Sequence, residues 1–430
     1  MQIHRVVAGE TLDEIASAYG VSLRDLLRYN ELASKDVIVP GLALLIPKGP
    51  PVRVIRHTVQ AGDTLMRLAH RYGVAPAEIA NWNPGLPGEG PWPPGTVVNI
   101  PGTRSDRRSI EVNAYLMPAG NENDAALLQD VSELTYVCAF HYRVQATGHL
   151  DAPNDRRLLE AAAQFHIAPL ATLTNFHDSH FDPHLAHAIL HSPSLARRVI
   201  DEAVRLCEEK GYRGVNVDFE RVQPGDRAAY TSFIRALKKA LEPRGWSLSV
   251  ALHPKSWDEP SAPRTGAYDY AALGDVADLV MLMTYEWGWV AGPPTPMAPA
   301  HRVESVLEYA TGVIEPKKIL MGMSLYGYDW PLPYVAGKTR AASIANNDAQ
   351  NLAIAEHVPV EWDLRAASPH FEYETAGIQH EVWFEDALSA AVKLALVDAF
   401  DLRGVSLWVL GNEFPQLWYL LKDGYKLEKE

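Results

Sequence analysis

The sequence GVNVDFE, at residues 214–220, is the most informative stretch of this 430-residue chain. Polar and apolar residues alternate through it, which is the period of a β-strand. Asn216, Asp218 and Glu220 therefore share one face of the predicted strand, and the apolar residues share the other. Two carboxylates that face a buried interior are costly unless they have a function, so we expect Asp218 and Glu220 to belong to a site.

Apolar runs of strand length recur on both sides of this stretch, and amphipathic helical stretches separate them. Helical periodicity is clearest at 195–209 and 230–241. Such alternation predicts an α/β fold of parallel βα units, and eight strands predict a closed (β/α)8 TIM barrel. The eight predicted strands are 111–117, 134–140, 168–173, 214–219, 248–252, 279–283, 319–325 and 404–410.

The predicted barrel occupies residues 109–430 and has one long interruption before its last strand. Residues 328–392 lie between the seventh and eighth strands and contain polar, strand-like pieces. This segment is longer than one βα connection needs. We predict a small α+β insertion there, on the rim where barrel enzymes carry their reactive groups.

The first hundred residues contain a duplicated segment. VVAGETL at 6–12 matches VQAGDTL at 59–65, and the match continues to Ile-Pro at 46–47 and at 100–101. Each copy is typical of a strand, two helices and a closing strand, with Thr11 and Thr64 as N-caps of the first helix. We predict two βααβ modules, at residues 3–48 and 56–102.

Both copies resemble the LysM module, and the resemblance is specific because it occurs twice in register. It implies that the chain binds peptidoglycan or another glycan that contains N-acetylglucosamine, such as chitin. The shared residues Leu12, Ala16 and Tyr19 are expected to serve the fold rather than the ligand.

The central strand resembles the DGxDxDxE signature of glycoside hydrolase family 18, the chitinase-like barrels. Asp218 and Glu220 fill its last two acidic positions, whereas Arg213 and Asn216 stand where the family has its first and middle aspartates. MTYE at 283–286 is similar to the family's M-x-Y-D/E motif at the sixth strand, and Trp408 lies on the eighth strand, where the family places a tryptophan under the sugar.

This resemblance implies a substrate-assisted route with retention of anomeric configuration, in which the substrate's 2-acetamido oxygen attacks the anomeric carbon. Glu220 would act as the acid and then as the base, Asp218 would hold the acetamido N–H, and Tyr285 would donate its hydroxyl to the acetamido oxygen. An asparagine at 216 removes one source of upward pressure on the pKa of Asp218, so we expect altered tuning rather than loss of the acid.

Other polar and aromatic residues near strand ends are candidates for lining a sugar cleft, where aromatic faces pack on pyranose rings and polar groups fix hydroxyls. Each of them alone is more often a packing residue. These substrate-binding candidates are Asn113, Tyr115, Tyr142, Asn175, Asn216, His253, Met283, Glu286, Trp287, Tyr326 and Trp408.

Composition excludes several classes of partner. The net charge of −14 and the lack of a long basic run argue against nucleic acid. Cys138 and Cys207 are too few for a disulfide framework, so we expect both to be reduced and buried. We predict no membrane insertion, because no stretch is long and apolar enough. Residues 1–10 also lack the apolar segment of a signal peptide.

A histidine-rich run extends from His177 to His191 and offers spacings that suit metal ligands on a helix. No cysteine accompanies it, and the family that the barrel resembles needs no metal. We therefore expect no metal site and no cofactor, and we interpret the run as a surface loop and helix that change charge near neutral pH.

The pair of LysM-like modules followed by this variant signature is similar to the N-acetylglucosaminidases that degrade spore-cortex fragments in germinating bacteria. The leading hypothesis is therefore a peptidoglycan hydrolase of the spore coat or cortex that cleaves β-1,4 bonds at N-acetylglucosamine, made in the cytoplasm without a signal peptide. One alternative is a chitinase acting on chitin oligomers. The other is a non-catalytic, glycan-binding spore-coat protein, although Glu220 is present.

Overall fold

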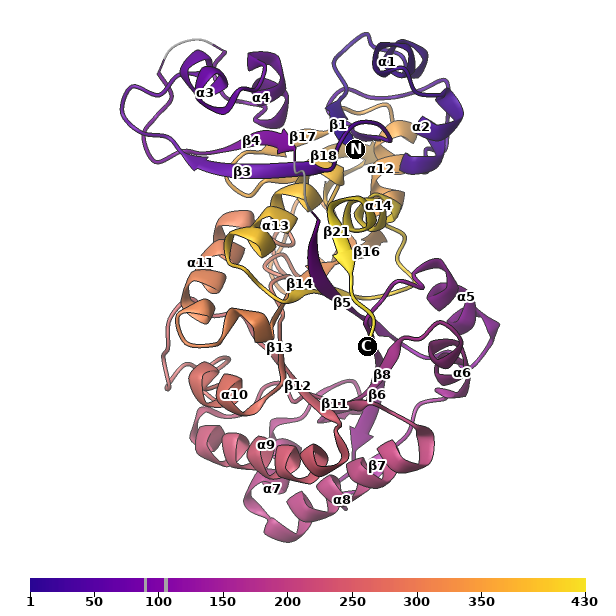
Figure 1. The fold of residues 1–430 in the computed structure, drawn as a ribbon, viewed down its shortest axis with the longest axis vertical. Coiled ribbons are helices and arrows are strands. Elements are labelled where there is room, and N and C mark those ends of the chain that lie inside the picture. The colour runs from indigo at the N-terminus through magenta and orange to yellow at the C-terminus, as the bar shows by residue number, and fades with distance from the viewer. Residues whose placement is uncertain (89–90, 104–106) are drawn as a thin grey trace.

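The computed structural model describes residues 1–88, 91–103 and 107–430. Eight parallel strands form a closed barrel, because the first strand pairs with both the second and the eighth (Figure 1). All eight predicted strands are confirmed, with ends that differ by a few residues. They are β5 (Arg108–Leu116), β6 (Tyr136–Val144), β8 (Ala168–Thr174), β11 (Gly214–Asp218), β12 (Ser247–Leu252), β13 (Leu279–Leu282), β14 (Ile319–Ser324) and β20 (Gly404–Trp408).

Helices surround the barrel, and the apolar face of each strand packs against them. Cys138 in β6 and Cys207 in a covering helix are free and buried, as predicted. Among helices of the described ranges, none is long and apolar enough to cross a bilayer. The surrounding helices are α5 (Glu122–Asp130), α6 (Arg156–Gln164), α7 (Pro183–His191), α8 (Pro193–Lys210), α9 (Arg227–Leu241), α10 (Tyr270–Val276), α11 (Ala300–Thr311), α13 (Ala387–Ala399) and α14 (Pro415–Gly424).

A five-stranded antiparallel sheet interrupts the barrel between β14 and α13. Its strand order is β16-β15-β19-β18-β17, and one helix, α12, lies within the same segment. The elements are β15 (Tyr326–Pro331), β16 (Ala342–Ala345), α12 (Asn346–Ala355), β17 (Glu361–Asp363), β18 (Ser368–Thr375) and β19 (Ile378–Trp383). Because β15 follows the carboxyl end of β14 directly, this sheet rises from the rim that carries the strand ends of the barrel.

Two βααβ modules precede the barrel. In each, the two strands pair antiparallel and the two helices pack on them. The first contains β1 (Gln2–Arg5), α1 (Leu12–Tyr19), α2 (Leu23–Asn30) and β2 (Ala43–Ile46), and the second contains β3 (Val52–Thr58), α3 (Leu65–Tyr72), α4 (Pro76–Trp82) and β4 (Val97–Thr103).

The helix caps of the two modules follow from their sequences. Thr11 accepts from the backbone N–H of Glu14, and the Glu14 carboxylate accepts from the N–H of Thr11, which completes a capping box. Thr64 accepts from the N–H of Arg67, but the arginine side chain has no acceptor to return the bond. The second cap therefore has only half of the reciprocal pair.

A buried asparagine performs the same task in both modules. Asn30 donates to the carbonyls of Leu26 and Leu45 and accepts from the N–H of Leu45, so it joins α2 to β2. Asn83 makes the equivalent three bonds to Ile79 and Asn99. Both amides are buried and hydrogen-bonded at the oxygen and the nitrogen, which satisfies the main requirement for a polar group in a core.

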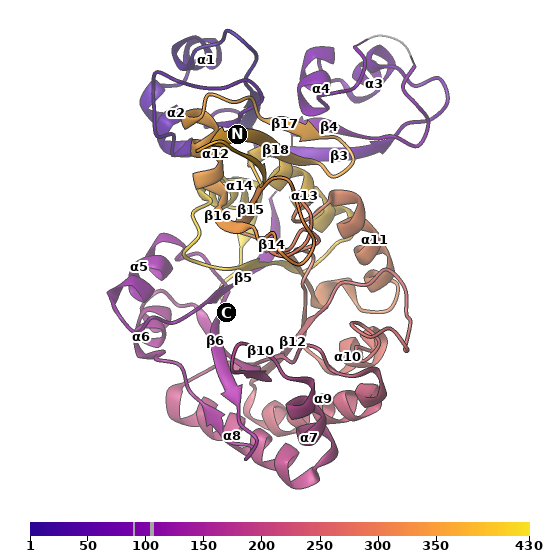
Figure 2. The ribbon, with the colours of Figure 1, turned by 180° about the vertical axis from the view of Figure 1, so that it is seen from behind.

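The first module packs tightly on the barrel's antiparallel sheet. Leu26 and Leu44 belong to the same buried cluster as Phe371 and Val382 of that sheet. At Gly41 the backbone lies so close that an added Cβ would be 1.8 Å from the carbonyl oxygen of Val360, and its φ of +87° also favours glycine. The two parts therefore share one buried core, and their ribbons lie side by side in Figure 2.

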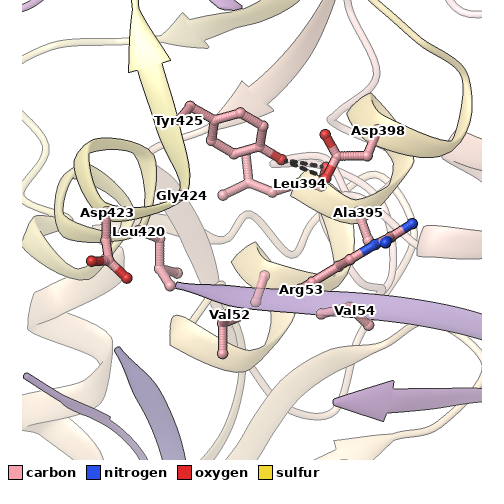
Figure 3. Close-up of a pocket in the computed structure, with 11 residues that line it drawn as sticks. Val52, Arg53, Val54, Leu394, Ala395, Asp398, Leu420, Asp423, Gly424 and Tyr425 are labelled. Carbon is pink, nitrogen blue, oxygen red and sulfur yellow. Dashed lines mark hydrogen bonds between the residues drawn. The ribbon is translucent and has the colours of Figure 1, made fainter. Parts of the chain in front are cut away.

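The second module rests on the barrel through β3, which crosses α13 and the end of α14. A cavity of about 20 Å³ lies at this junction, lined by Val54, Leu394 and Leu420, and the hydroxyl of Tyr425 donates to Leu394 and Asp398 beside it (Figure 3). Such a space has room for about one water molecule. It is a gap in packing between module and barrel rather than a ligand site.

Candidate active site

The strand β11 directs its polar residues into the barrel, as its alternation predicts. Asn216 and Asp218 are 0% and 4% exposed, and Val215 and Val217 pack toward the helices. Asn216 is fully engaged: it accepts from the Tyr115 hydroxyl at 3.1 Å and donates to Ser249 Oγ at 2.9 Å. Asn216 therefore links β11 to β5 and β12 inside the barrel, beneath the acidic residues.

Asp218 is a buried carboxyl group whose Oδ1 has no hydrogen-bond partner among the described residues. Its pKa is raised well above the ordinary value, first by burial and then by the negative charge of Glu220. The carboxyl group therefore keeps its proton to a higher pH than an exposed aspartate does. An unpartnered oxygen in a buried position is the feature expected of a group that meets a ligand.

Glu220 follows β11 and is more accessible, with a side chain that is 22% exposed. Its Oε2 lies 3.1 Å from Nε2 of His253, which follows β12. Its backbone is held by Asn175, whose side chain accepts from the Glu220 N–H at 2.9 Å and donates to the Glu220 carbonyl at 2.8 Å. Asn175 also donates to the carbonyl of Asp182, so it positions Glu220 rather than facing the cleft.

Tyr285 follows β13 and lies in the electrostatic field of the same carboxylates. Burial raises its pKa well above the ordinary value, and Glu286, Asp218 and Glu220 raise it further. The hydroxyl therefore keeps its proton and is available as a donor. The ring fits against β14 only because residue 322 is glycine, where an added Cβ would lie 2.7 Å from the ring.

The rim of the site joins the barrel to the antiparallel sheet. The Glu286 carboxylate accepts from the hydroxyls of Tyr326 and Tyr328 of β15. Glu286 has a φ of +59°, a left-handed conformation that is uncommon for a residue with a side chain and that occurs at functional sites. The carboxylate is thus aimed at the inserted sheet by its own backbone.

The remaining candidates divide into two groups. Trp408, Met283, Trp287 and His253 are half-buried at the carboxyl ends of their strands. Asn113 and Tyr115 are almost fully buried; Asn113 donates to Ser406 Oγ at 2.9 Å, and Tyr115 packs edge-on to Trp408. Asn113 and Tyr115 therefore support the floor of the site and present little surface to a ligand.

Tyr142 lies outside this group, contrary to the expectation that it lines the cleft. Its hydroxyl contacts Asp155, Tyr212 and Lys210, and its ring belongs to the core between strands and helices. The pairing of β6 with β8 shifts register between Ala139 and Tyr142. This irregularity moves Tyr142 to the outer face, which simple alternation along the strand could not predict.

His141 was not singled out by the sequence, yet it lies beside the site. Its ring stacks on Phe140, which packs edge-on to Trp408, and its Nδ1 is 3.0 Å from Thr174 Oγ1. Burial, with a smaller effect of Arg143, lowers the pKa of His141 to about 4, so the ring is neutral at neutral pH. The sequence signal that could have identified His141 was the pair Phe140-His141 at the end of the second predicted strand.

Two carboxyl groups at the end of β11 and a protonated tyrosine at the end of β13, two strands away in one parallel barrel, together with two preceding βααβ modules, are the arrangement of a barrel glycosidase with appended glycan-binding modules. Comparison with known families agrees. Residues 177–413 match the model of glycosyl hydrolases family 18, and residues 4–47 and 57–101 match the LysM domain. The chain belongs to glycoside hydrolase family 18 and carries two LysM domains.

Similar proteins include full-length relatives. The chain is 36% identical to the cortical fragment-lytic enzyme of Bacillus subtilis (strain 168), covering 100% of this chain and 99% of that protein. The spore cortex-lytic enzyme SleL of Bacillus megaterium QM B1551 has a similar structure, with a TM-score of 0.84, 34% identity and coverage of 100% and 99%. A chitinase from Chromobacterium violaceum ATCC 12472 matches 73% of this chain and 98% of its own, with a TM-score of 0.67 and 30% identity.

The raised pKa of Asp218 predicts a stability cost that depends on pH. A raised pKa means that the folded protein binds this proton more tightly than the unfolded chain, so ionised Asp218 destabilises the fold at high pH. The cost disappears as the pH falls below about 3.9, where Asp is protonated in both states. Asp218→Asn cannot ionise, and we expect it to be more stable than the parent at pH 8 by about 1 kcal/mol or more.

Urea unfolding at pH 4, 6 and 8 measures this difference, which should shrink toward pH 4. Asp178→Asn is the matched control, because the Asp178 side chain is 81% exposed. A stability gain that does not change with pH, or that Asp178→Asn reproduces, would contradict the assignment.

Proposed function

We propose that this protein hydrolyses β-1,4 bonds at N-acetylglucosamine in fragments of spore-cortex peptidoglycan during germination. The observation that carries the proposal is the buried Asp218 carboxyl, whose Oδ1 has no hydrogen-bond partner among the described residues, beside the more accessible carboxyl group of Glu220. The full-length similarity to the Bacillus cortical fragment-lytic enzyme supports the choice of substrate. We further propose that the protein acts at the spore coat or cortex, and that its units are residues 3–48, 56–102 and 109–430.

In the first step Glu220 donates its proton to the glycosidic oxygen while the substrate's acetamido oxygen attacks the anomeric carbon, so the bond to the leaving sugar breaks and a cyclic oxazolinium forms. For this step the proton shared by the two carboxyl groups lies on Glu220, so the ionised Asp218 accepts a hydrogen bond from the acetamido N–H and balances the developing positive charge. Tyr285 donates its hydroxyl to the acetamido oxygen and orients it for attack.

In the second step the Glu220 carboxylate takes a proton from water, whose oxygen attacks the anomeric carbon from the face that the leaving group vacated. The acetamido group is restored, and the product keeps its anomeric configuration. His253, at 3.1 Å from Glu220, lies within hydrogen-bond reach of the group that changes protonation in both steps.

Asn216 is compatible with this scheme. Its amide bonds to Tyr115 and Ser249, so it is not a proton partner for Asp218. Burial and Glu220 keep the pKa of Asp218 raised without a middle aspartate. We propose that Glu286, Trp287, Tyr326 and Trp408 contact the sugar from the rim, whereas Asn113, Tyr115 and Asn216 support the floor.

A cleft between the two LysM modules supports their proposed role in holding the glycan. It has a volume of about 470 Å³, within the range of about 300–1,000 Å³ that is usual for ligand sites. Tyr19 of the first module, which the sequence assigned to the fold alone, and Tyr72 of the second line it at equivalent positions, together with Glu78 and Asn81 of α4. Such aromatic and polar groups suit a sugar chain.

The acid–base role of Glu220 is tested by Glu220→Gln, which keeps the size of the side chain but cannot donate or accept the catalytic proton. We expect kcat to fall by about 10²-fold or more, with folding and glycan binding unchanged. New reducing ends released from cortex fragments measure kcat, and circular dichroism with a pull-down on insoluble peptidoglycan checks the fold and binding. Undiminished turnover would contradict the assignment, and absence of turnover in the parent protein would favour a glycan-binding coat protein.

The choice between cortex and chitin is tested by comparing the two substrates directly. We expect kcat/KM on purified cortex fragments to exceed that on chitin oligomers of similar length, because the full-length relatives are named for the cortex. Mass spectrometry of the products identifies the bond cleaved. Robust action on chitin with none on cortex fragments would instead support the chitinase alternative, which the Chromobacterium structure favours.

Filling the inter-module cleft should separate binding from catalysis. Ala77 is exposed and lines the cleft, so Ala77→Trp would occupy it. We expect retention on insoluble peptidoglycan to weaken by about tenfold, with kcat/KM on soluble fragments unchanged. Ala80→Trp is the control, since Ala80 is exposed on the same helix but does not line the cleft. Equal retention by the two variants would exclude this cleft as the glycan site.

A further inference from the structure

The histidine-rich run does not act as a unit in the structure. His177 and His180 lie in β9 (Phe176–His177) and β10 (His180–Phe181), and His184 is exposed near the start of α7. His187 and His191 lie one turn apart on α7, with ring centroids 4.4 Å apart. Among the residues the structure describes, these two and the carboxylate of Asp226 form the one group of three side chains that could hold a metal ion.

Asp226 reaches the pair from a distant part of the chain. It ends the short 3₁₀ turn η1 (Pro224–Asp226) and immediately precedes α9, which lies against α7 in both views (Figures 1 and 2). Its Oδ1 is 2.8 Å from Nδ1 of His187 and 2.8 Å from Nε2 of His191. Nothing in the sequence places residue 226 beside residue 191, so the histidine run alone gives no sign of this carboxylate.

The Asp226 carboxylate lies in an environment that is unfavourable for a charged group. The Asp226 side chain is 3% exposed, and its Oδ2 is buried without a hydrogen-bond partner among the described residues. Burial of an unsatisfied polar oxygen costs free energy unless another group meets it. The two imidazoles are about half exposed, so an ion can reach the three side chains from solvent.

We propose that His187, His191 and Asp226 form a binding site for one divalent transition-metal ion of the Zn²⁺ class. The three ligand atoms lie within 4.8 Å of one another, and the half-exposed rings can turn to bring both nitrogens to the distance of about 2.0–2.1 Å that Zn²⁺ requires. Two imidazole nitrogens select this class over Mg²⁺ or Ca²⁺, which prefer oxygen ligands. Water completes the coordination on the exposed side.

The site is structural, and it bears on Glu220 through the loop between them. Glu220 begins the segment that ends at Asp226, and Asn175 already ties its backbone to Asp182, the N-cap of α7. A metal on His187 and His191 would tie the other end of the same segment to the last turn of α7. Both ends of the loop that follows the catalytic strand would then be fastened to one helix.

The test uses the full chain after chelator treatment and dialysis. Titration calorimetry with ZnCl₂ should give one site per chain, and a saturating concentration should raise the Tm by about 2 °C or more. Substitution of Co²⁺ for Zn²⁺ should give a visible absorption spectrum typical of nitrogen and oxygen ligands. The variant His187→Ala/His191→Ala should lose the bound ion, the Tm shift and the Co²⁺ spectrum.

His184→Ala is the matched control, since it removes an exposed histidine from the same helix and should leave all three signals unchanged. Asp226→Asn should weaken binding, and its circular dichroism in the metal-free state checks that it folds. The proposal is overturned if the chain binds no Zn²⁺ at millimolar concentration, or if the double variant binds it as the parent does. In the first case the cluster is a hydrogen-bonded histidine-carboxylate network only.

Discussion

The structure of the candidate active site depends on one constraint, the burial of the Asp218 carboxyl group inside a closed barrel. Its Oδ1 has no hydrogen-bond partner in the described part of the chain, and Glu220 adds a negative charge beside it. A carboxyl group in that position destabilises the fold whenever it ionises. Asn216, on the same face of β11, is satisfied by its own partners Tyr115 and Ser249, so it adds no unpaired group beside the carboxyl.

The groups around Asp218 come from different strands, and each is held by a contact outside the site. Asn175 holds the backbone of Glu220, and Gly322 leaves the space in which the ring of Tyr285 lies. Glu286 is aimed by its left-handed backbone at two tyrosines of the inserted sheet. Precise placement of this kind is what catalysis requires, because reacting groups must be oriented before the substrate arrives.

Local periodicity was enough to predict the eight strands and the inward face of β11, because these depend on residues close together in sequence, and the internal repeat was enough to predict the two modules. Periodicity failed for Tyr142, where a register irregularity in β6 reverses the face. His141, which precedes Tyr142, was missed for the same reason, because the irregularity in β6 also changes the face on which it lies. The meeting of His191 with Asp226 is a contact between helices whose packing depends on the whole barrel, so the histidine run alone could not reveal it.

The inserted sheet connects glycan binding to the catalytic rim. One of its strands, β15, supplies Tyr326 and Tyr328 to Glu286, while Phe371 of β18 and Val382 of β19 share a core with the first LysM module. Buried amides reinforce the junction, since Gln416 of α14 donates to Asn30 of the module and to Gln350 of α12. Removing any one of these amides would leave a buried polar group unpaired, so the junction resists partial separation. Because the module and the rim share one packed sheet, a glycan held by the first module has a fixed direction relative to Asp218 and Glu220, unlike one held by a module on a flexible linker.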